Sequence, residues 1–298
     1  MTTASVLAAQ TNLVIVSGIG GDPKYTKSFA TLSWTLAQAA RDRGKLPDSS
    51  IVWLGDTSAS KMAGFRGAST RVNIESVLGR LAAKNSGQVV VVLIGHGSGE
   101  GAETRISLPG PDMTAADFAR ALAVFGERRV AFVNLTSASG DMLELMSGPT
   151  RVVMTATKSA FQRNESQFAR YFVDAYAKDG ADSDKDSRVS LLEAFRYADA
   201  ETKRYYETDG KLATENAQLA DASQLAARFF LAGSGGSAAS SPRLNSLYAE
   251  RTVLDDQILA LKKRKTNMGA EAYDTELERL LLSLALKSRE IRQLERGS

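Results

Sequence analysis

The feature that most constrains the fold is residues 89–94, a VVVVLI run without a polar side chain. A strand that is apolar on both faces must be covered on both faces, which is typical of the centre of a parallel sheet. Further short apolar segments alternate with segments of helical periodicity along residues 12–230. This alternation predicts an α/β protein with a mostly parallel sheet between two helical layers.

The expected strands and helices follow from the period of the apolar residues. We expect strands at residues 13–17, 51–54, 89–94, 130–134 and 151–156. We expect helices at residues 28–43, 70–84, 167–178 and 191–206. One more helix should open within residues 113–117, with the Thr114 hydroxyl as its N-cap.

The chain changes character after residue 232, where residues 233–241 (GSGGSAASS) have the composition of a flexible linker. Residues 242–298 carry two runs of apolar residues at spacings of three and four, interrupted by TNMG. This pattern predicts an antiparallel helical hairpin, whose apolar stripe needs cover from its own domain or from another copy of the chain. The predicted organisation is a flexible terminus at 1–11, one domain at 12–232, the linker and the hairpin.

Composition limits the classes of partner. The net charge of +3 gives no indication of a nucleic-acid partner, and no apolar stretch is long enough to span a membrane. The chain has no cysteine, which excludes disulfides and thiolate metal sites. Small residues in positions 1–10 look like the remnant of an export signal, which would place the protein in the periplasm or outside the cell, and a frayed terminus is the alternative.

Polar residues on glycine-rich turns follow two of the expected strands. The sole histidine, His96, follows residues 89–94 within GHGS, and Ser137 follows residues 130–134 within TSASG. Parallel strands present their carboxyl ends at one edge of the sheet, where α/β proteins place their chemistry. The glycines after the first strand do not favour dinucleotide binding, because proline stands where the motif needs its last glycine.

This order of residues resembles the caspase and legumain-like (clan CD) cysteine peptidases, closest to the legumain type and its uncharacterised bacterial relatives. Their histidine motif ends a strand as His-Gly-Ser, which His96-Gly97-Ser98 matches. Their nucleophile motif, Ala-Cys-Glu-Ser-Gly, is matched by residues 136–140, with Ser137 at the cysteine position and Ala138 in place of the glutamate. The resemblance covers about residues 12–230 and implies a caspase-like three-layer sandwich.

The resemblance also implies a role for each residue of the site. His96 would be the general base or acid, the backbone N–H of Gly97 would stabilise an oxyanion, and Ser137 would be the nucleophile or its remnant. Three interpretations stay open: a degenerate site, a cysteine peptidase that carries a Cys→Ser substitution at position 137, and a genuine serine hydrolase. A serine hydroxyl needs an oriented base, whereas a thiol is partly ionised near neutral pH. For His96 alone, a hydrogen-bonded histidine at the rim of the sheet is the alternative.

A second motif, DSDKDSRVSLLE at residues 182–193, fits an EF-hand calcium loop. The expected ligands, at positions 1, 3, 5, 7, 9 and 12 of that loop, are Asp182, Asp184, Asp186, the carbonyl of Arg188, Ser190 and Glu193. Position 6 is normally glycine, and the serine found there should weaken binding, because a positive φ costs it on the order of 1 kcal/mol. The expected ion is a structural Ca2+, and a polar turn between two helices is the alternative.

Two functions fit these observations. The first is a caspase/legumain-like peptidase-fold protein with a His96/Ser137 dyad, a hydrolase of peptide or protein substrates if it is active. The second is a non-enzymatic scaffold, stiffened by calcium, that binds a partner through the vestigial cleft or the C-terminal hairpin. The hairpin also predicts self-association, and neither function calls for nucleic acid or a membrane span.

Overall fold

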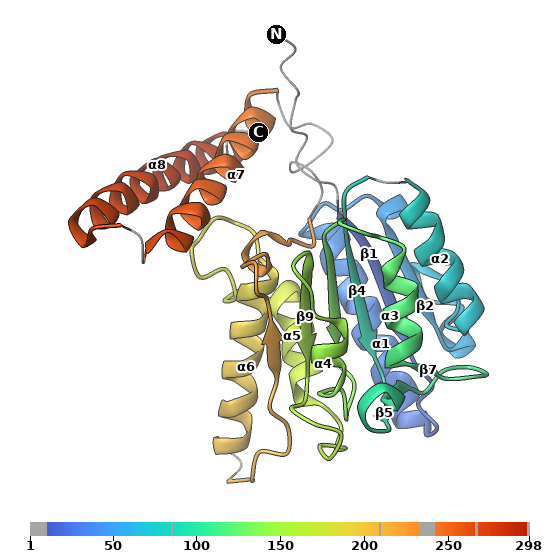
Figure 1. Cartoon of the computed structure of the whole chain (residues 1–298). Helices are drawn as coiled ribbons and strands as arrows, with labels where there is room; N and C mark the ends of the chain where they lie inside the picture. Colours follow the sequence, from blue (N-terminus) through green and yellow to red (C-terminus); the bar gives the residue numbers. More distant parts are fainter. Residues whose placement is uncertain (1–10, 85, 209, 233–241, 266–267, 297–298) are drawn as a thin grey trace. The chain divides into compact units, whose positions relative to one another are not determined.

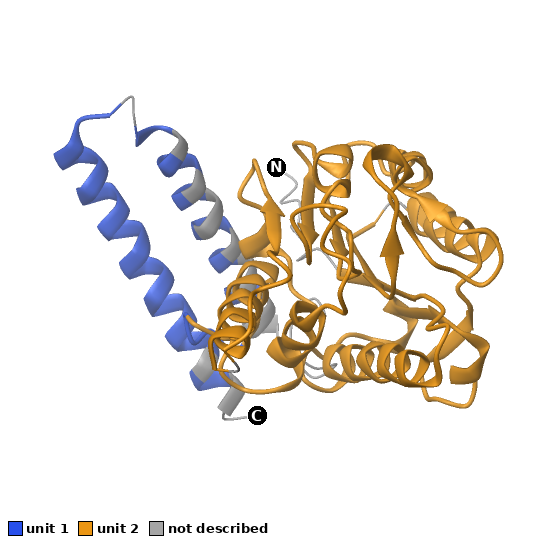
Figure 2. Cartoon of the chain, turned by 90° about the horizontal axis from the view of Figure 1, so that it is seen from below, with its two compact units in different colours: residues 1–10, 184–187, 233–298 blue, residues 11–183, 188–232 orange. Residues whose placement is uncertain are grey.

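A computed structural model of the chain describes residues 11–84, 86–208, 210–232, 242–265 and 268–296 (Figure 1). Residues 1–10 of the predicted flexible terminus and the predicted linker at 233–241 lie outside the described residues, whereas residue 11, also predicted to be flexible, is buried in the first strand. The chain divides into two compact units, coloured separately in Figure 2. Residues 11–183 and 188–232 form one unit, and the other includes residues 184–187 and the C-terminal helices.

A seven-stranded sheet forms the centre of the larger unit, in the order β10-β9-β8-β4-β1-β2-β3. Its strands are β1 (Thr11–Ser17), β2 (Ile51–Gly55), β3 (Phe65–Ala68), β4 (Gln88–Ile94), β8 (Val130–Asn134), β9 (Arg151–Thr155) and β10 (Gln218–Ala220). All neighbouring strands are parallel except β10, which runs antiparallel to β9. The long apolar run therefore forms a central strand, as its lack of polar residues predicts.

Helices cover both faces of this sheet. They are α1 (Pro23–Asp42), α2 (Arg71–Lys84), α3 (Ala115–Ala123), α4 (Met142–Met146), α5 (Gln167–Ala177) and α6 (Leu191–Thr208). Alternate residues of β1 enter two separate cores: Leu13 packs with the core that includes α1, α5 and α6, and Val14 with the core that includes α2, α3 and α4. The result is the predicted α/β three-layer sandwich, consistent with a caspase-like fold.

Local chemistry explains where the helices begin. The carboxylate of Asp22 accepts a hydrogen bond from the Lys24 amide at 2.7 Å and caps α1, so this helix begins earlier than the apolar spacing predicts. The predicted cap of α3 is confirmed as a capping box, in which Thr114 and Asp117 each bond the backbone of the other. Caps of this kind fix the residue at which each helix begins.

The C-terminal helices, α7 (Pro242–Lys263) and α8 (Ala270–Arg296), form the predicted antiparallel hairpin. One apolar cluster of the seam contains Leu247 and Ile291, and another contains Ile258 and Leu280. Ion pairs join the two helices beside this seam, such as Lys287 with Glu250 at 2.5 Å. No helix of the described residues is long and apolar enough to cross a membrane, in line with the absence of a predicted span.

Several short elements have no counterpart among the predicted ones. A three-stranded antiparallel sheet follows β4 and consists of β5 (Gly97–Ser98), β6 (Arg105–Ile106) and β7 (Met113–Thr114). Single turns of 3-10 helix are η1 (Asp48–Ser50), η2 (Thr57–Ala59), η3 (Gly101–Glu103) and η4 (Ala226–Arg228). Strands of two residues are too short for a period in the sequence to reveal them.

Candidate functional site

His96 and Ser137 lie just beyond the ends of two neighbouring strands. His96 follows β4 and Ser137 follows β8, and these strands pair in parallel with Leu93 opposite Asn134. After β1 the chain runs outward to β2 and β3 and then returns to β4 on the other side of β1. Such a reversal of strand order separates the loops at the carboxyl edge and is where open α/β sheets bind ligands.

The structure brings Ser137 and Gly97 into direct contact. The backbone N–H of Gly97 donates to the Ser137 hydroxyl at 3.2 Å, and this hydroxyl lies 3.3 Å from the Gly97 carbonyl oxygen, to which it donates. Ser137 is only 3% exposed. The expected nucleophile and the expected oxyanion donor are therefore adjacent where the loops that follow β4 and β8 meet.

The imidazole of His96 packs against two aromatic rings of α1. Its centroid lies 4.7 Å from that of Tyr25 and 4.9 Å from that of Phe29, both at edge-on angles. Among the described residues, no hydrogen bond joins this ring to Ser137. The half-buried histidine is thus fixed by packing, and the serine hydroxyl is bonded to backbone rather than to the expected base.

The loop that carries Ser137 is held in one conformation. The Thr157 hydroxyl accepts from the amides of Ser139 and Gly140 at 2.8 and 3.1 Å. Ala138 takes a left-handed backbone with φ of 51°, and its amide donates to the Gln162 carbonyl at 2.8 Å. Strained backbone persists where its surroundings fix it, so this loop is preorganised rather than adaptable.

The loop that carries His96 requires glycine at position 97. A Cβ at Gly97 would lie 2.1 Å from the Ser137 carbonyl oxygen and 2.7 Å from the Thr136 hydroxyl. Gly140, on the opposite loop, is equally close to the backbone of Lys158. The loop of Gly97 approaches the loop of Ser137 closely only because Gly97 has no side chain, and Gly140 in the same way lets the Ser137 loop pack against the segment that follows β9.

Chemically, this arrangement positions a serine without activating it. A serine hydroxyl becomes a nucleophile when an oriented base accepts its proton. Here the hydroxyl of Ser137 donates to the carbonyl of Gly97, and the Gly97 N–H is occupied by the same hydroxyl. Attack on a substrate would require this pair of bonds to be exchanged for one to His96.

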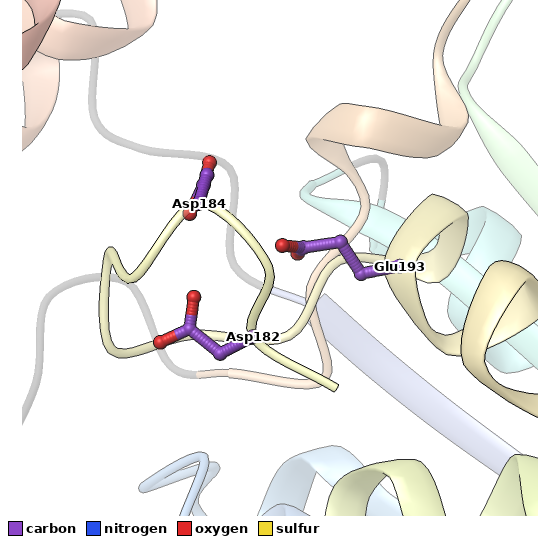
Figure 3. A group of neighbouring side chains, drawn as sticks. All are labelled: Asp182, Asp184 and Glu193. Carbon is purple, nitrogen blue, oxygen red and sulfur yellow. The ribbon is translucent and has the colours of Figure 1, made fainter. Parts of the chain in front are cut away.

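A second candidate site lies in the loop before α6. Ligand atoms of Asp182, Asp184 and Glu193 all lie within 4.8 Å of one another, so this acidic trio could hold a metal ion. Figure 3 shows Asp182 and Asp184 on the loop and Glu193 on α6. Three carboxylates this close repel one another unless a cation or hydrogen-bond donors offset their charge.

One residue of this loop has the backbone conformation that the motif requires at its position. Ser187, at the position usually held by glycine, adopts the left-handed region with φ of 70°. The carboxylate of Glu193 accepts from the amide of Ser183 at 2.9 Å and from the amide of Ser190 at 2.9 Å. The amide of Leu191 donates to the Phe229 carbonyl at 2.8 Å, which ties the end of the loop to a separate segment.

Three of the expected ligand residues, Asp186, Arg188 and Ser190, are not among the trio. The carboxylate of Asp186 pairs with the guanidinium of Arg251 at 2.5 Å. The guanidinium of Arg188 stacks over the ring of Phe230, 4.0 Å from its centroid. Next to the trio's glutamate, burial raises the pKa of the Tyr176 phenol well above its usual value, and the charge of Glu193 raises it further.

Glu215 is a buried polar residue to which the sequence assigned no role. Its carboxylate accepts from the amides of Gln167 and Phe168 at 2.7 and 3.1 Å, and from the hydroxyl of Ser166 at 2.8 Å. The hydroxyl of Tyr206 donates to it at 3.1 Å. An anion at a helix N-terminus stabilises the helix, so Glu215 anchors α5 to the segment that leads into β10.

No protein-family model matches this chain, and no curated protein matches its sequence. The indications of function lie in two sites of the structure. The first holds Ser137 against Gly97 at the carboxyl edge of the sheet, and the second gathers three carboxylates before α6.

Proposed function

We propose that this protein is a caspase/legumain-like peptidase-fold protein whose site binds peptides at the carboxyl ends of β4 and β8. Ser137 stands where that family has its nucleophilic cysteine. The observation that carries this proposal is the 3.2 Å contact between the Gly97 amide and the Ser137 hydroxyl. An amide donor beside a nucleophile is the geometry that stabilises the oxyanion of acyl transfer.

With a nucleophile at this position, the reaction is acyl transfer. The side chain at position 137 attacks a peptide carbonyl carbon while His96 accepts its proton. The carbonyl oxygen becomes an oxyanion, which the Gly97 N–H stabilises. His96 then returns the proton to the leaving amine, and water releases the acyl group by the same steps. With serine in place, the hydroxyl is bonded to Gly97, so we expect peptide binding with little turnover.

The test is Ser137→Cys, assayed on a mixed peptide library beside the unmodified chain. We expect hydrolysis from the cysteine variant and its loss in the double variant Ser137→Cys/His96→Ala. Ser98→Cys is the matched control, because it places a thiol on the exposed Ser98 of β5, two residues from His96. Silence from Ser137→Cys, or activity that survives without His96, would contradict the proposal.

A scaffold without catalysis is the second candidate, and the burial of Ser137 favours it. A nucleophile that is 3% exposed and bonded to backbone is inaccessible to a substrate unless the loops part. In this case Ser137→Ala leaves peptide or partner affinity unchanged, and Ser137→Cys is inactive although it binds peptides as the unmodified chain does. Peptide binding measured by calorimetry for both variants separates the two candidates.

We further propose that the loop at 182–193 binds one Ca2+ as a structural ion. The acidic trio and the positive φ of Ser187 support this ion, since carboxylate oxygens on a tight loop are the ligands that Ca2+ prefers. A ligand that binds only the folded state stabilises it by about 2.7 kcal/mol at 100 times its Kd. We expect thermal unfolding to shift upward with calcium relative to chelator.

The matched variants for this experiment are Glu193→Gln and Glu207→Gln. Glu193→Gln removes the expected bidentate ligand and should abolish the calcium-dependent shift. Glu207 is exposed near the far end of the same helix, so its variant should keep the full shift. Identical unfolding midpoints with calcium and with chelator in the unmodified protein would refute the calcium site.

A further inference from the structure

A buried ion pair lies within the smaller compact unit, between residue 186 of the proposed calcium loop and a helix of the C-terminal hairpin. The guanidinium Nη2 of Arg251, on α7, lies 2.5 Å from Oδ2 of Asp186, and both side chains are only 5% exposed. Asp186 belongs to residues 184–187, which form one compact unit with the hairpin helices. The Nη1 of Arg251 is also buried and has no hydrogen-bond partner among the described residues.

Arg251 pairs with a carboxylate that the proposed calcium loop needs as a ligand. Asp186 stands at the fifth position of the motif, from which an EF-hand loop supplies a ligand. The other three carboxylates lie within 4.8 Å of one another, and Asp186 is outside this group. The cation that the structure places on the fifth position is therefore a guanidinium of the chain itself.

Two cations cannot share this carboxylate at low energetic cost. A buried ion pair is stable only while each charge keeps its partner, because desolvated charges are strongly penalised when unpaired. Ca2+ coordinated by Asp186 would place a second positive charge next to the buried guanidinium. Like charges in a site with little water repel strongly, so the ion and Arg251 oppose each other.

We propose that Arg251 is a built-in competitor of Ca2+ for Asp186, so that the ion and the α7 contact exclude each other. This inference rests on the proposed calcium site and adds its regulation. Without calcium, Arg251 holds Asp186 and secures α7 to residues 184–187. With calcium, Asp186 turns to the ion and the α7 contact is lost. Because coupling between two binding events is reciprocal, whatever secures Arg251 to Asp186 also weakens calcium binding.

The experiment is titration of Ca2+ by calorimetry into the full chain and into Arg251→Met. We expect the variant to bind calcium between about 5-fold and about 150-fold more tightly, the usual range of such coupling. Arg279→Met is the matched control, because it removes one positive charge from an exposed pair with Glu276 on α8 and should leave the Kd unchanged. Amide hydrogen exchange along α7 is the second measurement, and calcium should accelerate it in the unmodified chain.

The results of the titration separate the competition from the calcium site itself. Equal Kd values for the unmodified chain and Arg251→Met, or weaker binding by the variant, would overturn the competition and leave the calcium site standing. No calcium binding by either protein would overturn the site and the inference together. If Arg251→Met does not fold, hydrogen exchange in the unmodified chain decides alone: bound calcium without faster exchange in α7 would refute the competition.

Discussion

Replacing Gly97 by alanine tests whether the two loops of the site must touch. The new Cβ would lie 2.1 Å from the Ser137 carbonyl oxygen and 2.7 Å from the Thr136 hydroxyl. Ordinary contacts of carbon are about 3.5 Å, so the gap between the loops must widen by more than about 1 Å. The loop of Ser137 resists this movement, because the Ala138 amide is fixed to the Gln162 carbonyl at 2.8 Å.

The expected cost follows from this clash. Overpacking of a rigid region typically costs about 1 to 3 kcal/mol, and the obstacle here is backbone rather than the end of a flexible side chain. We therefore expect Gly97→Ala to lower the free energy of unfolding by about 3 kcal/mol. In the Ser137→Cys background it should also abolish hydrolysis, since the displaced amide can no longer reach the oxyanion.

Denaturation by urea measures this change directly, and Gly79→Ala is its control. Gly79 is exposed within α2 and a Cβ there meets no atom within 4 Å, so alanine should stabilise the protein by about 0.5 to 1 kcal/mol. The two substitutions are chemically identical and have opposite expected signs. Unchanged stability for Gly97→Ala would refute the close packing of the two loops.

Two further predictions concern buried carboxylates. Glu215→Gln should lower the free energy of unfolding by about 2 kcal/mol in urea, because it weakens the charged cap of α5, whereas the exposed Glu207→Gln should not. Burial would raise the pKa of Asp117, but hydrogen bonds from Thr114 and the charges of Arg71 and Arg120 hold it below its usual value. Its stabilisation is therefore complete above about pH 4 and lost as pH falls through the folded-state pKa, so Asp117→Asn should flatten the acid limb of stability.

The sequence predicts those elements whose own pattern of apolar and capping residues shows where they begin or which faces they bury. Residues 89–94 could only be a strand covered on both faces, and the Thr114 cap is recognisable from one local motif. The strands β5, β6 and β7 have two residues each and carry no period of their own. The edge strand β10 is half-buried and has three residues, and its place depends on partners far away in the chain.

The candidate sites show the same division between local and distant signals. His96 and Ser137 are predictable because parallel strands end at one edge of a sheet. The contact of His96 with Tyr25 depends on how α1 crosses that sheet, which no local pattern encodes. The pairing of Asp186 with Arg251 joins residues on either side of the linker, and the sequence alone assigned this carboxylate to an ion.

The ends of the sheet have a consequence for behaviour in concentrated solution. Its outermost strands are β10, with three residues, and β3, with four residues and an irregular register against β2. Exposed strand edges invite another molecule to extend the sheet, and short or irregular edges discourage such pairing. The longest strands, β1 and β4, would offer the most backbone groups for pairing with another molecule, and both lie in the interior of the sheet. Edge-to-edge aggregation is therefore disfavoured by the strand order itself.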